Sequence, residues 1–299
     1  MQLLSPSSWS DYELIDCGDF EKLERFGSYI TIRPEPQAVW NKGLTNREWE
    51  DRAHVRFIPN SSSAEDWKKL KQIPDRWNVK YKIQDTKFNG DDELHFRLAL
   101  TSFKHVGIFP EQAVNWEYIY DSVKQLSQKQ EEVKVLNLFA YTGGASLAAK
   151  AAGADVVHLD SVKQVVTWAR ENMELSGLKD IRWLVEDAMT FVKREVKRGK
   201  KYQGIILDPP AYGHGTDGQK WKLEEMINEM MKMVFSLLDE NNYFLLLNSY
   251  SLGFSSLIVE NLLKEKISSA TESETGELFL QSTTGLKLPL GVFGRVRKI

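Results

Sequence analysis

Cysteine is almost absent from this chain, and no long apolar run interrupts it. The single cysteine, Cys17, excludes an internal disulfide and a metal cluster held by several cysteines. This cysteine usage suits a reducing cytosol, so we expect a cytoplasmic protein without a metal. No apolar stretch reaches the roughly 20 residues of a membrane-spanning helix, and the first residues lack the pattern of a signal peptide. We therefore expect no membrane partner.

An excess of charge of one sign is also lacking. The 299 residues contain 39 Lys and Arg against 42 Asp and Glu, which gives a net charge of −3. Any RNA binding would therefore have to come from a local patch. The composition is that of an ordinary globular chain with room for one large domain or two modest ones. The sequence does not indicate an oligomeric state.

The most informative stretch covers residues 133–160. An apolar strand at 133–139 leads into a turn, Tyr141-Thr142-Gly143-Gly144, which is followed by an alanine-rich helix. Gly153 stands where that helix should end, and a second apolar strand finishes on Asp160. This order predicts one half of a nucleotide-binding βαβ unit. The glycines let the backbone approach a ligand, and the Asp160 carboxylate can accept hydrogen bonds from two ribose hydroxyls.

The same stretch indicates which nucleotide binds. A dinucleotide fingerprint needs a third glycine, and a phosphate-binding loop needs a Lys-Ser or Lys-Thr pair. Here Gly143-Gly144 is followed by Ala145, Ser146 and Leu147. A ligand with adenosine but no phosphates fits better, and S-adenosylmethionine is the common one. The alternative is a strand-turn-helix without a ligand, and the acidic end of the second strand favours the ligand.

Strands and helices alternate beyond Asp160. We expect strands at 181–185, 204–207 and 243–247, and helices at 162–175, 189–197 and 219–238. This alternation predicts a mainly parallel sheet with its ligand crevice at the carboxyl ends of the strands. Asp160, Asp187, Asp208 and Asn248 would share that edge. Asp187 is also placed to cap the next helix, and capping is compatible with a contact to the adenine amine.

Residues 1–105 show a different pattern, of short strands and short helices, which predicts a small α+β domain that binds substrate. Strands are expected at 12–16, 28–33, 77–83 and 94–100, with a hairpin turn at 89–92 and short helices at 20–26 and after Thr45. Residues 106–299 would form the cofactor-binding domain. Pro110 can open a helix that runs to about residue 130 and leads into the first sheet strand.

The segment Asp208-Pro209-Pro210-Ala211-Tyr212 is the second chemical feature. Two prolines fix the backbone after a strand and remove two N–H donors, which leaves carbonyls and the Asp208 carboxylate as rigid acceptors. Such a set can hold an amino or imino group of a planar ring, and Tyr212 can stack on that ring. The alternative is a stiff strand exit with a core tyrosine. Gly213 and Gly215 predict a mobile lid after this segment, which counts against that alternative.

These motifs resemble those of class I S-adenosylmethionine-dependent methyltransferases, in particular the bacterial large-subunit rRNA enzymes that modify cytosine at carbon 5. The similarity rests on residues 137–144, Asp160, Asp187 and residues 208–212, and covers about residues 100–250. The segment 107–112 is similar to a motif that lies against the cofactor in that group, with Glu111 in place of its aspartate. The PUA module of that group has no counterpart here.

The resemblance implies a Rossmann-like methyltransferase sheet that binds S-adenosyl-L-methionine, with RNA, in particular rRNA, as substrate. Asp208 and Tyr212 would act on the target. The cofactor would contact a larger set of residues, namely Gln112, Asn137, Phe139, Tyr141, Thr142, Gly143, Asp160, Ser161, Asp187, Ala188 and Asp208.

One departure from that group concerns the mechanism. Methylation of cytosine carbon 5 needs a cysteine thiolate, which lies there in a Ser-Cys-Ser sequence after the fifth strand. The matching residues here are Ser249-Tyr250-Ser251, and Cys17 belongs to the other predicted domain. We therefore expect direct transfer to a nitrogen or oxygen. Two alternatives remain: methylation of a protein or small molecule, and a cofactor-binding protein without catalysis that acts in RNA binding or assembly.

Overall fold

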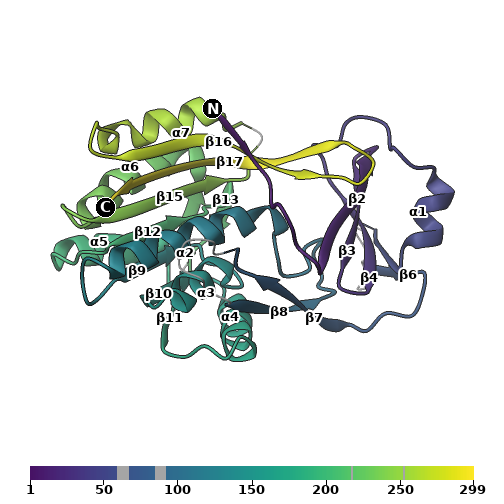
Figure 1. The fold of residues 1–299 in the computed structure, drawn as a ribbon, viewed down its shortest axis with the longest axis horizontal. Helices are drawn as coiled ribbons and strands as arrows, with labels where there is room; N and C mark the ends of the chain where they lie inside the picture. Colours follow the sequence, from purple (N-terminus) through teal and green to yellow (C-terminus); the bar gives the residue numbers. More distant parts are fainter. Residues whose placement is uncertain (59–66, 85–91, 217, 252) are drawn as a thin grey trace.

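An eight-stranded sheet forms one part of the molecule, shown on the left of Figure 1. The computed structural model describes residues 1–58, 67–84, 92–216, 218–251 and 253–299. The strand order is β1-β16-β17-β15-β12-β9-β10-β11. The strands are β1 (Gln2–Leu4), β9 (Lys134–Leu138), β10 (Asp155–Asp160), β11 (Ile181–Val185), β12 (Gly204–Leu207), β15 (Tyr243–Ser249), β16 (Glu272–Gln281) and β17 (Lys287–Lys298). All neighbours pair in parallel except those of β17, so the predicted mainly parallel α/β sheet is confirmed.

Helices cover both faces of this sheet. Successive residues of a strand point to opposite faces, so Val135 of β9 enters one apolar core and Leu136 the other. Buried on both sides, the central strands are apolar almost throughout, as is typical of parallel sheets. One face is covered by α2 (Ala113–Ser127), α3 (Gly144–Ala151) and α4 (Lys163–Leu175), and the other by α5 (Ala188–Lys197), α6 (Leu223–Leu237) and α7 (Ser256–Leu263). Short 3-10 helices lie at Pro110–Gln112 and Lys264–Lys266.

The N-terminal part contains a separate sheet of order β2-β3-β4-β5-β6 and a two-stranded hairpin, β7–β8. Its elements are β2 (Tyr12–Gly18), β3 (Glu21–Phe26), β4 (Tyr29–Pro34), α1 (Asn46–Arg52), β5 (Val55–Phe57), β6 (Trp67–Lys69), β7 (Arg76–Lys82) and β8 (Glu93–Ala99). The predicted capping box is confirmed, because the Glu48 N–H donates to Thr45 Oγ1 at 3.3 Å and the Thr45 N–H to Glu48 Oε2 at 2.8 Å.

The helix predicted at 20–26 is wrong, because residues 21–26 form strand β3. Asp19 and Phe20 have φ values of +50° and +62° and make the two-residue turn between β2 and β3. Strand β3 pairs with both β2 and β4, and this cross-strand pairing overrides the local signal of a capped helix. The turn predicted at 89–91 lies outside the described residues.

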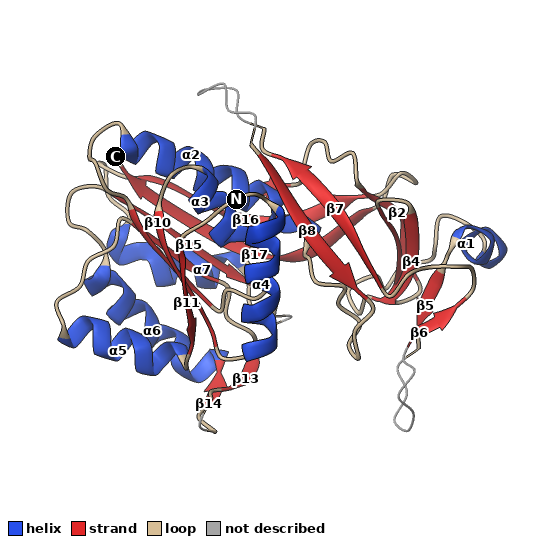
Figure 2. Ribbon diagram, turned by 90° about the horizontal axis from the view of Figure 1, so that it is seen from below, coloured by secondary structure: helices blue, strands red, loops and turns tan. Residues whose placement is uncertain are grey.

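The hairpin β7–β8 connects the two parts. Trp77, Val79 and Tyr81 of β7 are buried, whereas the residues between them are exposed, as the alternating sequence predicts. Figure 2 shows the hairpin between the N-terminal sheet and the helices of the larger part. Its buried side chains share one apolar core with Trp116 of α2. This core crosses the domain boundary predicted at residue 105, and the division into two domains stays a prediction.

The C-terminal strands β16 and β17 were not predicted. Strand β17 runs antiparallel to β15, and the turn after β16 reaches strand β2, where Thr283 Oγ1 donates to the Ile15 carbonyl at 2.8 Å. Thr284 Oγ1 donates to Asp16 Oδ1 at the same distance. Figure 1 shows this long hairpin in yellow, extending from the larger sheet toward β2. Strands β16 and β17 therefore connect the N-terminal sheet to the larger sheet, in which β1 pairs with β16.

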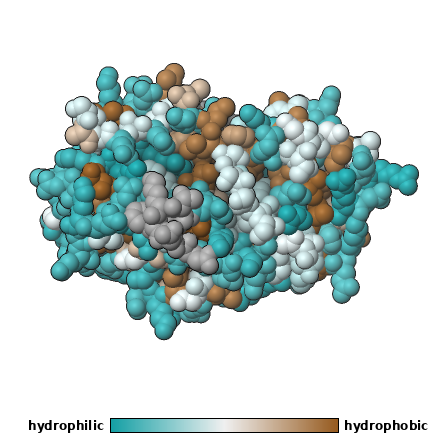
Figure 3. Space-filling view, in the orientation of Figure 1, coloured by the Kyte–Doolittle hydropathy of each residue, from teal (hydrophilic) through white to brown (hydrophobic). Residues whose placement is uncertain are grey.

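A small hairpin precedes α6. Its first strand lies in the segment predicted as a lid, and its second takes the place of the start of the helix predicted at 219–238. Strands β13 (Tyr212–His214) and β14 (Lys220–Lys222) pair antiparallel and project from the lower edge of the larger part in Figure 2. On the face drawn in Figure 3, hydrophilic side chains predominate and apolar ones form small patches. None of the helices in the described part of the chain is long and apolar enough to cross a membrane.

Candidate active site

The turn between β9 and α3 has an unusual backbone. Phe139, Tyr141 and Gly143 have φ values of +56°, +48° and +93°. Positive φ is uncommon for residues other than glycine and is concentrated at functional sites. Helix α3 starts at Gly144, where a Cβ would lie 2.7 Å from the ring of Trp116. The glycine therefore allows the first turn of α3 to lie directly against this indole.

Side chains from other segments hold the turn in place. Thr142 Oγ1 donates to the Gly107 carbonyl at 2.7 Å, and Asn172 Nδ2 donates to the Thr142 carbonyl at 3.0 Å. The Tyr141 N–H donates to Asp160 Oδ2 at 2.9 Å. The strained turn is thus fixed from β10, from α4 and from the segment before α2.

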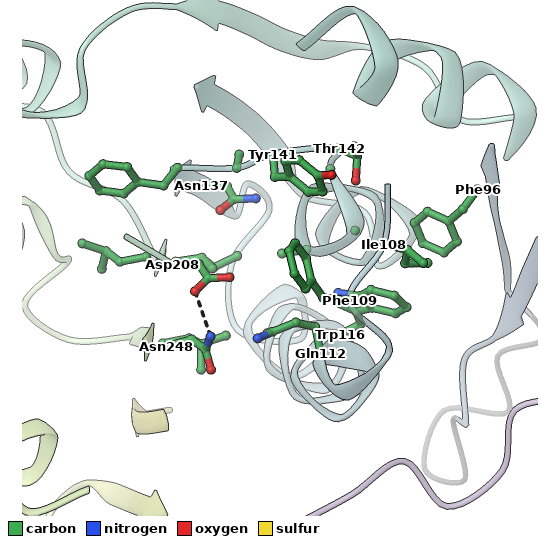
Figure 4. A pocket seen from close by; sticks show the side chains of 18 residues that line it. Phe96, Ile108, Phe109, Gln112, Trp116, Asn137, Tyr141, Thr142, Asp208 and Asn248 are labelled. Carbon is green, nitrogen blue, oxygen red and sulfur yellow. Dashed lines mark hydrogen bonds between the residues drawn. The ribbon is translucent and has the colours of Figure 1, made fainter. Parts of the chain in front are cut away.

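A cleft lies at the carboxyl ends of β9, β12 and β15, beside this turn. Figure 4 shows Asn137, Asp208 and Asn248 on one side of it and Phe109 and Trp116 on the other. We call it the main cleft. Its walls are formed by Phe96, Ile108, Phe109, Gln112, Trp116, Asn137, Phe139, Ala140, Tyr141, Thr142, Gly143, Gly144, Ala145, Ile206, Leu207, Asp208, Leu246 and Asn248. The structure therefore brings together seven of the residues predicted to bind the cofactor: Gln112, Asn137, Phe139, Tyr141, Thr142, Gly143 and Asp208.

Asp208 and Asn248 form a pair of acceptors in the main cleft. Asn248 Nδ2 donates to Asp208 Oδ1 at 2.8 Å, the bond drawn in Figure 4. Burial raises the pKa of Asp208, and the bond from Asn248 opposes this shift. Asn248 Oδ1 is buried and has no hydrogen-bond partner among the described residues. Because buried polar groups are normally paired, this oxygen is suited to accept a hydrogen bond from a ligand.

The remaining predicted cofactor residues lie on the same edge of the sheet, outside the walls of the main cleft. Asp160 ends β10, and its two oxygens accept hydrogen bonds at 2.9 Å from the N–H groups of Tyr141 and Val162. Burial raises the pKa of Asp160, while these backbone bonds lower it. The carboxylate thus fixes the glycine turn, and the sequence had not predicted this role.

Ser161 and Asp187 lie against the end of β13 and the residue that follows it. Asp187 is the predicted N-cap of α5, since its Oδ1 accepts from the Thr190 N–H at 2.8 Å, and Ala188 is the first residue of that helix. Ser161 Oγ donates to the His214 carbonyl at 3.0 Å. A Cβ on Gly215 would lie 3.0 Å from that of Asp187. The predicted lid segment therefore lies over this end of the sheet edge.

Tyr212 is not in the walls of the main cleft. It starts β13, its side chain is 51% exposed, and its hydroxyl forms a hydrogen bond of 3.1 Å with His214 Nε2. The proline turn before Tyr212 is held in place, because Trp221 Nε1 donates to the Pro210 carbonyl at 2.7 Å. Pairing between β13 and β14 sets this orientation of Tyr212, and the sequence had not predicted that pairing.

A buried polar chain that the sequence did not reveal orients Asn137. Asn137 Nδ2 donates to Ser146 Oγ at 2.9 Å, and Ser146 Oγ lies 3.0 Å from His158 Nδ1. Burial lowers the pKa of His158 to about 3, so its ring is neutral and Nδ1 can accept from the serine. His158 and Ser146 are fully buried. They position the side chain of Asn137, which lines the main cleft.

The single thiol is remote from this chemistry. Cys17 is fully buried in β2, and burial raises its pKa to about 11, so it is not a thiolate at neutral pH. At the position of the cysteine in the resembling group, the Tyr250 hydroxyl donates to Glu35 Oε1 at 2.6 Å. In the part of the chain that the structure describes, no group of three His, Cys, Asp or Glu side chains is arranged to hold a metal.

Comparisons with known proteins agree with this arrangement. A family model described as S-adenosylmethionine-dependent methyltransferase matches residues 79–268. The crystal structure of the SAM-dependent methyltransferase from Agrobacterium tumefaciens is 35% identical, has a TM-score of 0.88, and covers 100% of this chain and 94% of its own. A second structure, solved in complex with SAH, shares the fold at 14% identity with a TM-score of 0.70, covering 97% of this chain and 76% of its own.

Similarity to curated sequences is more distant. The ribosomal RNA large subunit methyltransferase K/L of Shewanella frigidimarina is 30% identical over 158 residues. That match covers 52% of this chain but only 21% of the Shewanella protein, so the chain corresponds to about a fifth of that relative. The similarity to this relative does not single out the enzymes that modify cytosine carbon 5. The family model matches more than half of the residues of this chain, so the chain belongs to the S-adenosylmethionine-dependent methyltransferases.

Proposed function

We propose that this methyltransferase acts on RNA, in particular rRNA, and transfers the methyl group directly to a nitrogen or oxygen. Asp208 and Asn248 are the residues on which this proposal chiefly rests, because they leave acceptor oxygens in the main cleft. The buried, protonated Cys17 favours a mechanism without a covalent cysteine. Distant similarity to a large-subunit rRNA methyltransferase supports RNA as the substrate class.

The residues of the main cleft fit S-adenosylmethionine, which supplies an electrophilic methyl group when bound. Asn248 Oδ1 is buried and unpaired among the described residues, so an acceptor is available to a ligand in the main cleft. We assign Gln112, Asn137, Phe139, Tyr141, Thr142 and Gly143 to cofactor binding. Asp160 and Ser161 would hold the ribose, and Asp187 with Ala188 would meet the adenine.

Asp208 has two tasks in this proposal. Its carboxylate would orient an N–H or O–H group of the acceptor and would take the proton that this atom loses on methylation. The raised pKa of Asp208 improves it as a proton acceptor, and Asn248 holds its orientation. Such a reaction needs positioning and proton removal more than covalent activation.

Tyr212 is the residue we assign to stacking on the target. Its ring is half exposed, and the hydrogen bond to His214 keeps it at the surface beside the proline turn. Residues 1–105 would supply further contacts to the RNA. We expect Tyr212→Ala to weaken RNA binding by roughly 1–3 kcal/mol, the usual value of a base–aromatic stack. Filter binding of RNA checks this, and calorimetry with the cofactor should give an unchanged affinity.

Mass spectrometry of rRNA from cells with and without the gene tests the proposal most directly. We expect one methylated nucleotide to be missing without the gene, and purified protein with tritiated cofactor to restore it. Methyl transfer to protein or small molecules, with intact rRNA methylation, would reject RNA as the substrate. Cofactor binding without any transfer would indicate the non-catalytic alternative.

A further inference from the structure

A buried chain of hydrogen bonds crosses the start of helix α2 and ends in the main cleft. Arg295 of β17 donates from Nε and from Nη2 to Asn115 Oδ1, at 3.2 and 2.6 Å. Asn115 Nδ2 in turn donates to Gln112 Oε1 at 2.6 Å. Asn115 is 1% exposed and Arg295 is 6% exposed, whereas Gln112 lines the main cleft. The chain therefore connects strand β17 with a wall of the main cleft.

Arg295 sets the direction of every hydrogen bond in this chain. A guanidinium group can only donate, so Asn115 must turn its oxygen to Arg295 and its nitrogen to Gln112. For the same reason Gln112 turns its oxygen to Asn115, which leaves its Nε2 to the main cleft. Figure 4 shows this nitrogen pointing across the cleft toward Asn248, whose Oδ1 is an unpaired acceptor among the described residues. The cleft thus has a donor on one side and an acceptor on the other.

The guanidinium group of Arg295 is held firmly and stays charged. It lies over the rings of Tyr118 and Phe293, at 4.8 and 4.7 Å from their centres. Its Nη1 is 3.6 Å from Glu274 Oε2. Burial lowers the pKa of Arg295 to about 10, which is still well above neutral pH. Arg295 therefore remains a group that only donates, and the direction of the chain is fixed at neutral pH.

We propose that Arg295 and Asn115 are positioning residues, which hold the Gln112 amide with its Nε2 toward the carboxylate of S-adenosylmethionine. This inference rests on the assignment of Gln112 to the cofactor made above. Asp160 and Asp187, assigned to the ribose and the adenine, lie at the ends of β10 and β11, so the amino-acid end of the cofactor would occupy the main cleft. A carboxylate only accepts hydrogen bonds, and an amide N–H is a suitable donor to it.

The same contacts attach β17 to α2, and a purely structural role would affect stability alone. Asn115→Asp separates the two roles. Aspartate still accepts from Arg295, now as an ion pair, and the first turn of α2 favours a negative charge. Aspartate cannot donate to Gln112, however. The Gln112 amide should therefore turn and present its oxygen, in place of its nitrogen, to the main cleft.

Calorimetric affinities for S-adenosylmethionine and for its decarboxylated form, which lacks only the carboxylate, test the inference. We expect wild-type protein to prefer the complete cofactor. Asn115→Asp should lower this preference about tenfold or more, the effect of losing a hydrogen bond to a charged group. Its melting temperature should be no lower than that of the wild-type protein. Asn228→Asp, the same change at an exposed position of α6, should leave the preference unchanged.

Two substitutions of Arg295 give a second test. Arg295→Lys keeps a cationic donor at Asn115 and should retain the preference for the complete cofactor. Arg295→Met removes the group that orients Asn115, so both orientations of that amide become populated and the preference should fall a few-fold. If Asn115→Asp does not fold, these two variants decide, and an equal preference in both would overturn the inference.

Gln112→Glu separates the inference from the assignment on which it rests. If Gln112→Glu keeps the wild-type preference, Gln112 does not bind the carboxylate, and both the assignment and the inference are overturned. If Gln112→Glu loses the preference and folded Asn115→Asp keeps it, Gln112 binds the cofactor without being oriented by Asn115. The inference then fails, while the assignment of Gln112 stands.

Discussion

The main cleft differs in its chemistry from the charged cluster beside it, which consists of Lys22, Arg33, Glu35, Lys104 and Glu111. In the main cleft, backbone and uncharged side chains predominate, and the strained turn is fixed by bonds from Asp160, Asn172 and Thr142. In the charged cluster, Arg33 pairs with Glu24 and Lys22 with Glu35, while burial raises the pKa of Glu111 to about 7. The turn of the main cleft is therefore held by hydrogen bonds, whereas the charged cluster is held by buried ion pairs.

This difference also explains what the sequence could reveal. The turn at 141–144 and the acidic strand ends are local signals, because a parallel sheet brings the ends of β9, β10 and β12 to one edge. Trp116 against Gly144 could not be predicted, since that contact depends on how α2 packs on α3. The charged cluster combines segments around residues 22–35 and 104–111, which no local pattern connects.

The largest effect should come from the acceptor side of the main cleft. Asp208→Asn keeps the shape and the neighbour Asn248 but removes the proton acceptor. We expect single-turnover methyl transfer to fall by about 10²–10⁴-fold, the range for loss of general acid–base catalysis. Rapid-quench measurements check this rate. Wild-type turnover in the variant would show that Asp208 does not take the proton.

A pH-dependent stability difference should mark Glu111 of the charged cluster. The folded pKa of Glu111, about 7, lies above its ordinary value of 4.5 because of burial, so its contribution to stability is full below pH 4.5 and is lost as pH rises to 7. At pH 8, Glu111→Gln should therefore stabilise the fold by about 3 kcal/mol relative to its effect at pH 4. Urea unfolding at both pH values checks this, and an equal effect at both would contradict it.

A smaller effect is expected where the carboxylate serves the cofactor and the turn. Asp160→Ala removes the acceptor of the Tyr141 and Val162 N–H groups and of the proposed ribose bonds. Affinity for S-adenosylmethionine should fall by roughly 2–3 kcal/mol, as expected for hydrogen bonds to a charged group. Isothermal titration calorimetry measures it, and circular dichroism verifies the fold. Unchanged affinity in a folded variant would remove Asp160 from the cofactor site.

The smallest effect should be at Cys17, which lies outside both sites. Cys17→Ala removes a buried, protonated thiol and should leave the rate of methyl transfer essentially unchanged. A methyl-transfer assay at equal concentrations of folded protein checks this. Complete loss of transfer in a variant that still binds the cofactor would require a covalent mechanism instead.

The division of labour between the cofactor and acceptor sides is the central claim, and one experiment tests it directly. Single-turnover transfer to rRNA is measured for Asp160→Ala and Asp208→Asn at saturating S-adenosylmethionine. We predict that Asp160→Ala regains the wild-type rate, because excess cofactor offsets its weaker binding, and that Asp208→Asn stays slow. The reverse result, with Asp208→Asn restored by cofactor and Asp160→Ala slow, would contradict this account.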